Sequence, residues 1–550
     1  MKSILTVFLI IFFVFSCDDT SSTNNSNNTN NDAGTDAADS DVIEDSGVVE
    51  NPYCVSINEP TRPFIQDGTG SGLYSVASDI TIPTTEGNLR LSEIWTGCDS
   101  ILFIPENPSQ NGDFPGMTWS RDIAALLDNI PENVHLFFIS DTADETARGE
   151  SLTALQALFD AEFDDMPIPH ANHWRERVHF VTVRARDAEG FLGDHFPSPG
   201  FGLGIDRFQR LRYIGSFADP SRYNESVGWF EPNLSFVRNE SIYYNFESKR
   251  EEDLALNTWE TLPLISENPV AGDHFFTVDF PSSAEMELYD TMIFDMTMRC
   301  ENGGEVGSCP EWDRLVHLYL CTDSTDESCN LEIGRWITSY HRHGRWVHDV
   351  SPLMGLFANG GNFRFKYYSQ DPWIVTLTAK LTNKNKTRRV SSVHPLWSGY
   401  FEFNETYNDN FTPVDVTIPD NYGSVELASV ITGHGMSNPG NCAEFCNTEH
   451  TFSINDGDVV RSFTEAGRMV DCMLKSEEGT VPNQYGTWWY GRSGWCPGKE
   501  VQLVTEDITT HVSGPGVNQV SYTGFYNDQP YTGDNWRGIM ITAFVVVYTE

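Results

Sequence analysis

The sequence predicts a mostly β fold, in which two antiparallel β-sandwiches follow an α/β accessory domain. Beyond about residue 268, apolar and polar residues alternate with a period of two, as in 292–299 and 363–368, which predicts strands with one buried face. The loops there are rich in Gly, Asn and Asp and helical stripes are few, as in antiparallel sandwiches. Before residue 268, strand-like and helical segments alternate, which favours a parallel or mixed sheet.

The accessory domain is predicted to span residues 51–267. Its strand-like runs are short and apolar, and between them apolar residues recur at helical spacing. In chain order we expect strand 101–104, helix 123–130, strand 134–139, helix 152–159 and strand 178–183. The series faintly resembles a thioredoxin-like domain, but no Cys-x-x-Cys follows the first strand, so redox catalysis is not expected there.

The rest of the chain is long enough for two further cores, because 550 residues exceed what one core usually organises. The first sandwich is predicted over residues 268–390 and the second over 391–550. A polar and basic run at 383–389 is the expected linker between them. The second sandwich ends in an aliphatic strand at 539–548.

The N-terminus predicts export and anchoring. Lys2 precedes an apolar run from Ile4 to Phe15, which is too short to span a bilayer as a permanent helix and ends at Cys17. Residues 1–17 are therefore interpreted as a lipoprotein signal peptide with Cys17 as the lipidated residue; a plain secretory signal is the alternative. Residues 18–50 are acidic and Asn-rich with almost no apolar side chains, which predicts a disordered tether. We expect a membrane-anchored lipoprotein of the cell envelope, on the outer membrane or the periplasmic face.

The net charge is −45, which argues against nucleic acid as a partner, because binding it requires clustered cations. Such a surface also suits the solubility of an exported protein and tolerates a neutral glycan.

The cysteine count fits an oxidising compartment. Without Cys17, ten of the eleven cysteines remain, an even number that favours disulfides over a structural zinc site, for which no four-ligand spacing is present. Sequence alone does not fix the connectivity. Local spacing favours the first three of the following pairs, and elimination then leaves the last two: Cys300–Cys309, Cys321–Cys329, Cys442–Cys446, Cys54–Cys98 and Cys472–Cys496.

Three segments combine a charged residue with a cysteine and an aromatic side chain. They are 309–314 (Cys-Pro-Glu-Trp-Asp-Arg), 442–446 (Cys-Ala-Glu-Phe-Cys) and 491–498 (Gly-Arg-Ser-Gly-Trp-Cys-Pro-Gly). Disulfides next to such residues would hold side chains still, as hydrolytic chemistry requires. The segments supply two carboxylates and two guanidiniums, on Asp313, Glu444, Arg314 and Arg492.

The ordered motifs resemble the bacterial peptide-N-glycosidase F family over about residues 270–550. Residues 331–338 and Gly433-His434 match further family segments between the three motifs. The resemblance implies two eight-stranded jelly rolls with a site at their interface. It also implies hydrolysis of the amide between asparagine and the innermost N-acetylglucosamine of N-linked glycans, on glycoproteins or glycopeptides, without a metal or an organic cofactor.

The resemblance assigns roles to individual residues. Asp313 matches the essential catalytic residue and Glu444 the second carboxylate; we expect Asp313 next to the scissile bond and Glu444 acting through water or on the sugar. One carboxylate would activate water while another group protonates the departing nitrogen. The expected substrate-binding residues offer apolar faces to sugar rings or hydrogen bonds to them: Trp312, Trp373, Trp495, Arg314, His434 and Arg492.

One position departs from the family pattern. The family has a third carboxylate shortly before a tryptophan, and here the strand reads Phe365-Lys-Tyr-Tyr-Ser-Gln-Asp-Pro-Trp373. Gln370 falls at the acid position, and Asp371 belongs to a one-residue extension. Either Asp371 substitutes for the third acid or that acid is absent. Asp371-Pro372 is also typical of a simple turn.

Two other functions stay open. A non-catalytic glycan-binding lipoprotein would keep the pocket and lose the chemistry through the change at Gln370. A copper-dependent monooxygenase with paired jelly rolls is the third reading, because His341, His343 and His348 could share a strand face. An exposed loop explains these histidines more simply, and a structural salt bridge is the simple alternative for Asp313 and Arg314.

Overall fold

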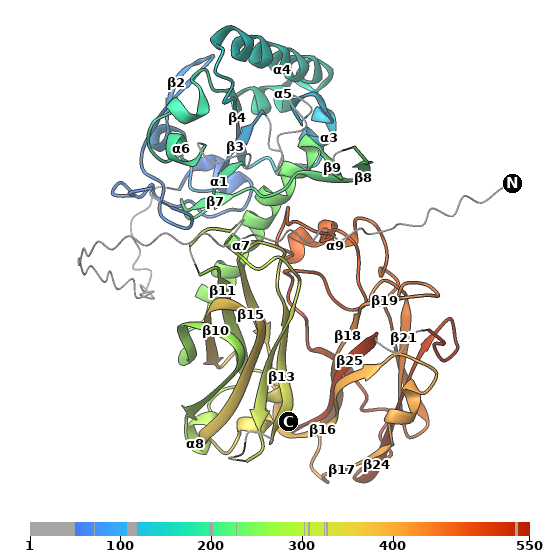
Figure 1. Cartoon of the computed structure of the whole chain (residues 1–550). Coiled ribbons are helices and arrows are strands. Elements are labelled where there is room, and N and C mark those ends of the chain that lie inside the picture. Colours follow the sequence, from blue (N-terminus) through green and yellow to red (C-terminus); the bar gives the residue numbers. More distant parts are fainter. Residues whose placement is uncertain are drawn as a thin grey trace, which may run out of the picture. The chain divides into compact units, whose positions relative to one another are not determined.

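The computed structural model describes residues 50–550 except 71, 107–117, 197–201, 227, 302, 306–307, 324, 326–327, 534–536 and 550. The predicted signal peptide, Cys17 and tether residues 18–49 lie outside the described residues. Residues 49–550 belong to one compact unit. Helices gather around the N-terminal sheet, whereas the later part of the described chain is mostly strand (Figure 1).

The N-terminal sheet is mixed, as the alternating pattern predicts. Its order is β5-β4-β3-β6-β7, in which β3, β4 and β5 are parallel and β6 and β7 antiparallel. All of β3 and β4 is buried because apolar clusters cover both faces. The strands are β3 (Ser100–Pro105), β4 (Val134–Ile139), β5 (Val178–Phe180), β6 (Leu203–Ile205) and β7 (Leu211–Tyr213).

Helices and two small hairpins complete this part of the chain. The longer helices are α4 and α7, and α4 begins with Asp144 as a cap that accepts from the Ala147 backbone N–H. The helices are α1 (Pro52–Ser56), α2 (Leu91–Ile94), α3 (Ile123–Leu127), α4 (Glu145–Asp165), α5 (Ile168–Arg175), α6 (Gly190–His195) and α7 (Arg238–Ala255). The hairpin strands are β1 (Thr81–Thr84) with β2 (Gly87–Arg90), and β8 (Ala218–Asn224) with β9 (Trp229–Pro232).

The next strands form a six-stranded antiparallel sheet of order β13-β12-β15-β11-β14, with β10 also paired to β15. Its first strand begins at Glu260, before the predicted boundary at 268. One large apolar cluster buries its side chains. The elements are β10 (Glu260–Phe280), α8 (Ser283–Met286), β11 (Thr291–Arg299), β12 (Leu315–Cys321), β13 (Cys329–Ile337), β14 (Gly344–Asp349) and β15 (Gly361–Thr382).

Two four-stranded antiparallel sheets follow, of order β16-β25-β18-β23 and β17-β24-β21-β22. Side chains from both sheets share one core, so they form an antiparallel sandwich. The strands are β16 (Arg389–Glu402), β17 (Val414–Ile418), β18 (Ser424–His434), β21 (Thr448–Ile454), β22 (Gly457–Ser462), β23 (Val504–Asp507), β24 (Gly516–Tyr526) and β25 (Gly538–Thr549). A short strand pair, β19 (Met436–Ser437) and β20 (Cys442–Ala443), follows β18 in the sequence. Helix α9 (Asp471–Leu474) follows β22. The mostly β prediction is confirmed; the jelly-roll topology stays a prediction.

Strand β25 explains how the two β regions are joined. Alternate residues such as Ile541 and Val545 enter the core of the second sandwich, whereas Phe544 and Val546 enter the core of the six-stranded sheet. A strand buried on both faces reads as a continuous apolar run, which accounts for the aliphatic C-terminal segment.

All five predicted disulfides are present: Cys54–Cys98, Cys300–Cys309, Cys321–Cys329, Cys442–Cys446 and Cys472–Cys496. They place the folded chain in an oxidising compartment, as expected for an exported protein. Among the described residues, no helix is long and apolar enough to cross a membrane.

Candidate active site

The structure brings three of the predicted charged residues together, with two carboxylates on one guanidinium. Arg492 has a fully buried side chain and lies between Asp313 and Glu444, whose side chains are 13% and 15% exposed. Its Nη2 is 3.3 Å from Asp313 Oδ2, and its Nε donates to Glu444 Oε1 at 3.0 Å. Segments 48 to 179 residues away from each other thus meet in one partly accessible acidic cluster.

Asp313 is held by the backbone on either side of it. It lies just before β12, next to the end of β13. Thr338 Oγ1 accepts from the Arg314 backbone N–H at 2.8 Å and donates to the Trp312 carbonyl at 2.9 Å. The Thr338 N–H donates to the Arg314 carbonyl at 3.0 Å. These bonds fix the main chain of 312–314 against the neighbouring strand.

Glu444 and Arg492 are positioned by each other's loops. The Ser493 N–H donates to the Glu444 carbonyl at 2.8 Å, and the Gly435 N–H donates to Glu444 Oε2 at the same distance. Gly494 has φ of +82°, and a Cβ there would lie 2.1 Å from the Ile431 carbonyl oxygen. Only glycine allows this close approach of the arginine loop to β18.

Tyr340 is a site residue that the sequence analysis missed. Its hydroxyl accepts from Arg492 Nη2 at 3.2 Å and hydrogen-bonds the Asp313 carboxylate. It stands two residues beyond Thr338, at the end of a matched motif. Its importance comes from contacts with residues that are distant in the sequence, so the motif alone did not mark it.

The pKa of Asp313 is raised to about 6, mainly because burial disfavours its ionised form. Arg492 and the hydrogen bond from Tyr340 lower it, and the neighbouring Glu444 raises it further. One guanidinium faces two carboxylates, so the cluster carries an excess acid that can bind a proton near neutral pH. Burial, and then Asp313, raise the pKa of Tyr340, which keeps this phenol protonated.

Aromatic rings cover the arginine. The guanidinium lies 4.8 Å from the ring of Trp495 and 5.2 Å from that of Phe445. Trp495 donates from Nε1 to the Gly433 carbonyl at 2.8 Å and stacks on His434 at 5.4 Å. Only 7% of Trp495 is exposed, and its contacts fix Arg492; that it also offers a face to a sugar ring stays a prediction.

His434 is half-buried beside this stack. Its Nε2 lies 2.7 Å from the Thr432 hydroxyl. Burial and then the positive charge of Arg335 lower the pKa of His434 to about 3, so its ring is neutral at physiological pH. A neutral imidazole can donate one hydrogen bond and accept another, which suits the predicted contact with sugar hydroxyl or acetamido groups.

The other predicted tryptophans differ in exposure. Trp312 is 49% exposed and lies beside Asp313, with its ring 6.5 Å from that of Tyr340. Trp373 is 1% exposed and belongs to the core of the six-stranded sheet. Strand alternation points Trp373 into the core, and a role in substrate binding stays a prediction.

The predicted third acid lies outside the arginine cluster. Residues Gln370, Asp371 and Pro372 form an irregular stretch of β15, where three residues oppose one on β10. Gln370 is exposed, and Asp371 Oδ2 is 3.9 Å from Arg314 Nε, beyond hydrogen-bond distance. The charged neighbour of Asp371 is therefore Arg314. Among the described residues, Asp371 forms neither a hydrogen bond nor an ion pair with Arg492.

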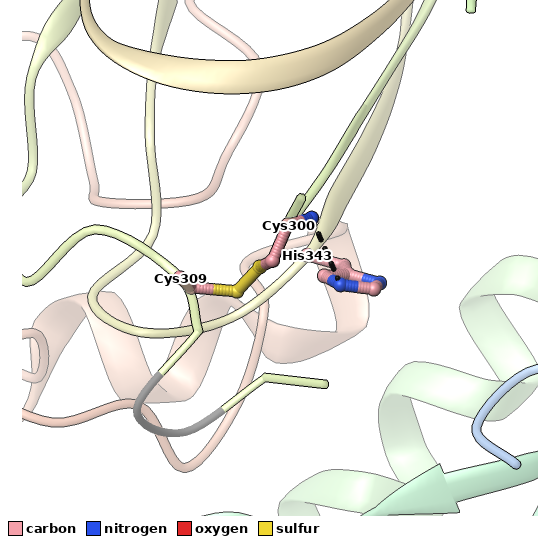
Figure 2. A group of neighbouring side chains, drawn as sticks. All are labelled: Cys300, Cys309 and His343. Carbon is pink, nitrogen blue, oxygen red and sulfur yellow. Dashed lines mark hydrogen bonds between the residues drawn. A yellow bond between two sulfur atoms is a disulfide. The ribbon is translucent and has the colours of Figure 1, made fainter. Parts of the chain in front are cut away.

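The three histidines of the copper reading do not form a common site. His348 is buried, with Nδ1 2.8 Å from Glu500 Oε1, while the ring of His341 packs on Tyr485. His343 accepts from the Cys300 N–H at 3.1 Å, beside the Cys300–Cys309 disulfide (Figure 2).

Among the described residues, Cys300, Cys309 and His343 are the group close enough to hold a metal ion. Both cysteines are joined in the disulfide, and a metal requires thiolates. This group is therefore a disulfide that closes a loop, with His343 beside it. His341 and His348 have other partners and do not join His343.

A second buried arginine lies where the two β regions meet. Arg335 donates two hydrogen bonds to the Glu332 carboxylate, from Nε to Oε1 at 3.0 Å and from Nη2 to Oε2. Its Nη1 donates to Thr432 Oγ1 at 2.8 Å. His317 Nδ1 lies 2.7 Å from the same Glu332 carboxylate. Arg335 and His317 hold the pKa of Glu332 well below its usual range against the opposing effect of burial. The sequence analysis did not single out these residues.

Comparison with known families gives a match in the second sandwich. The family described as peptide-N-glycosidase F, C terminal, matches residues 402–546, which contain Glu444 and Arg492. The resemblance stated from the motifs is confirmed: this part of the chain is similar to the C-terminal part of the peptide-N-glycosidase F family.

Individual relatives cover between 49% and 64% of the chain. It is similar to peptide-N(4)-(N-acetyl-beta-D-glucosaminyl)asparagine amidase F of Elizabethkingia miricola, with 24% identity over 302 residues, which is 49% of this chain and 77% of the relative. The solved structure of PNGase F, a glycosylasparaginase from Flavobacterium meningosepticum, is 19% identical with a TM-score of 0.41, covering 53% of this chain and 96% of that one. PNGF-II is 11% identical with a TM-score of 0.39, covering 64% and 74%.

Proposed function

We propose that the chain is an exported hydrolase that cleaves the amide bond between asparagine and the innermost N-acetylglucosamine of N-linked glycans. The products would be aspartate in the peptide and a glycosylamine. One observation carries the proposal: Arg492 holds two partly exposed carboxylates, and one of them, Asp313, has a pKa near neutrality beside an exposed tryptophan. The named activity of the Elizabethkingia relative supports it.

The first step of the proposed reaction is water attack on the amide carbon. The ionised Asp313 takes a proton from the attacking water, whose oxygen bonds to the carbonyl carbon. A base with a pKa near the working pH is efficient because it is ionised and still accepts a proton readily. Arg492 and the Tyr340 hydroxyl hold the carboxylate in place.

The second step breaks the carbon–nitrogen bond. The proton held by Asp313 passes to the departing nitrogen as the tetrahedral intermediate collapses, leaving a new carboxyl on the peptide and a neutral glycosylamine. This transfer restores the starting carboxylate, so no other proton source is needed. Glu444, held by the Gly435 N–H, orients the water or a sugar hydroxyl.

Substrate binding follows from exposure and hydrogen-bonding capacity. Trp312 offers an accessible apolar ring for the C–H face of a pyranose, and Arg314 lies 5.8 Å from that ring. The neutral His434 hydrogen-bonds a sugar substituent. N-linked glycoproteins and glycopeptides are the proposed partners, and lipidation at Cys17 with residues 18–50 as a tether is the proposed attachment to the membrane.

A second candidate is a non-catalytic glycan-binding lipoprotein. The observation that favours it is the third acid position, where Gln370 is exposed and Asp371 lies outside the Arg492 cluster. Such a protein would bind glycopeptide through Trp312 and His434 and release it unchanged.

Mass spectrometry in heavy-oxygen water separates these functions. A variant of the chain that begins at residue 51 is incubated with N-glycopeptides of several glycan types, with Asp313→Asn as control. Peptide carrying aspartate with one heavy oxygen, absent with Asp313→Asn, is the expected result. Intact but bound glycopeptide across all glycan types would favour the binding protein. Peptide that retains one N-acetylglucosamine would overturn the proposed bond.

A further inference from the structure

A buried ionic contact joins helix α7 of the N-terminal part to the segment that carries Tyr340. Arg342 donates from Nη1 to Glu240 Oε1 at 2.6 Å and from Nε to Glu305 Oε2 at 3.1 Å. It also donates to the carbonyls of Tyr213 and Pro482, each at 2.6 Å. The side chains of Arg342, Glu240 and Glu305 are at most 2% exposed.

The charges in this contact depend on each other. Burial raises the pKa of Glu240 to about 7, and the positive charge of Arg342 opposes that rise. Removing one partner of a buried pair leaves the other charge desolvated and uncompensated, which is strongly unfavourable. Glu240 is therefore the contribution of α7 that keeps Arg342 in place.

Arg342 lies close in sequence and in space to the candidate site. Tyr340, two residues earlier, contacts both Asp313 and Arg492. The His341 N–H donates to the Pro310 carbonyl at 3.1 Å, which ties this segment to the one that leads into Asp313.

Glu305 provides a second connection. Its carbonyl accepts from the Cys309 N–H at 2.8 Å, at the start of the segment that contains Asp313. Its carboxylate accepts from the His343 N–H at 3.3 Å, and the ring of His343 in turn holds the Cys300 N–H (Figure 2). Arg342 thus links Glu240 to both ends of this disulfide loop.

The loop 481–484 adds a third connection between the two parts. The Ser216 N–H of the N-terminal part donates to the Asn483 carbonyl at 2.7 Å, and Asn239 on α7 donates to the Asn483 side chain at 3.4 Å. The next residue, Gln484, accepts from the Tyr340 N–H at 2.8 Å. Two segments that fix Tyr340 therefore contact the N-terminal part: its own segment through Arg342, and the loop 481–484 through Asn483.

We propose that Glu240 is a positioning residue for the candidate active site: it fixes Arg342, and Arg342 fixes the segments that carry Tyr340 and Asp313. The N-terminal part is then a working component of the catalytic unit, although the glycosidase motifs lie wholly outside it. This inference rests on the proposed function only for its kinetic effects; the contact itself can be tested without catalysis.

The test compares Glu240→Gln and Glu240→Ala with Glu251→Gln in the full chain. Glu251 is a matched control on the same helix, because it pairs with Arg345 of β14 at 2.6 Å and has no bond to segment 338–343. Hydrogen exchange by mass spectrometry is followed in peptides covering 308–316 and 338–344. Steady-state kinetics on an N-glycopeptide are recorded across pH, with thermal unfolding as the check on folding.

For Glu240→Gln we expect faster exchange in both peptides, a fall in kcat of about 10- to 100-fold with little change in KM, and a shift of the pH profile that reports Asp313. Glu251→Gln should match the parent protein in all three measurements. Glu240→Ala extends the same trend if it folds.

Parent-like exchange, kcat and pH profile in a folded Glu240→Gln would overturn the inference. An inactive parent protein would remove the proposed function alone. In that case faster exchange confined to 308–316 and 338–344 would still establish that Glu240 positions these segments, and unchanged exchange would refute it.

Discussion

Two arginines with fully buried side chains, Arg492 and Arg335, lie near the meeting of the two β regions but have different surroundings. Arg335 faces one carboxylate, Glu332, which is 3% exposed, and the surrounding hydroxyl groups complete its hydrogen bonds. Arg492 faces two carboxylates that remain 13% and 15% exposed.

The charge balance explains the opposite pKa shifts. Around Arg335 each acid has its base, so the pKa of Glu332 is held well below its usual range. Around Arg492 one acid is in excess, and the pKa of Asp313 rises to about 6. A balanced, closed cluster contributes to structure, whereas an unbalanced and accessible one retains a proton-binding group for chemistry.

The largest expected effect is on activity. Asp313→Asn removes the proton acceptor but keeps the shape of the side chain, so kcat/KM should fall by about 10²- to 10⁴-fold. Glycopeptide turnover measured by mass spectrometry checks this, with unfolding curves to confirm the fold. Asp371→Asn is the control and should lose less than about tenfold, because Asp371 does not contact Arg492. Equal losses in the two variants would contradict the comparison.

Substitutions in the Arg335 cluster should mainly lower the free energy of unfolding. Arg335→Met leaves the buried Glu332 carboxylate without its main partner, at a cost of about 3–5 kcal/mol in the free energy of unfolding. Denaturant unfolding at neutral pH measures it. Arg492→Met should lose less stability, because Asp313 can take up a proton, while its activity falls. The distinction between the two clusters fails if both variants are destabilised alike and retain activity.

The excess acid should also lower stability at high pH. The folded pKa of Asp313 lies above its ordinary value of 3.8, so the folded state binds the proton more tightly than the unfolded state. Its burial therefore costs little at or below about pH 4, and the cost grows until it is complete above the folded pKa of about 6. Asp313→Asn should be more stable than the parent by up to about 3 kcal/mol at pH 8, and similar at pH 4. If Asp313→Asn is less stable than the parent at both pH values, burial of the ionised Asp313 carboxylate does not destabilise the fold.

The smallest effect is a shift in pH dependence. The hydrogen bond from Tyr340 lowers the pKa of Asp313, so Tyr340→Phe should raise that pKa by about one unit. Because the proposed base must be ionised, the rising limb of kcat/KM should move to higher pH by the same amount. Parallel profiles for the variant and the parent protein would show that Tyr340 does not act on Asp313.

The sequence predicted what depends on local pattern. Alternation located strands β11 and β15, and motif order brought Asp313, Glu444 and Arg492 to one site. The same alternation places Trp373 in the core. The sequence analysis grouped it with the exposed Trp312 because both are tryptophans near matched motifs. Tyr340 and the Arg335 cluster were missed because their importance comes from contacts between distant segments, which no local pattern contains.

The disulfides carry a practical consequence for preparing the protein. Cys442–Cys446 encloses Glu444, and Cys496 of Cys472–Cys496 follows Trp495 directly. In protein prepared from a reducing cytoplasm these two disulfides would not form, and the segments that carry Glu444 and Trp495 would lose their crosslinks. The protein should therefore be produced in a periplasm or a secretory pathway. For the same reason, a thiol reagent added to open a glycoprotein substrate would also act on the catalyst.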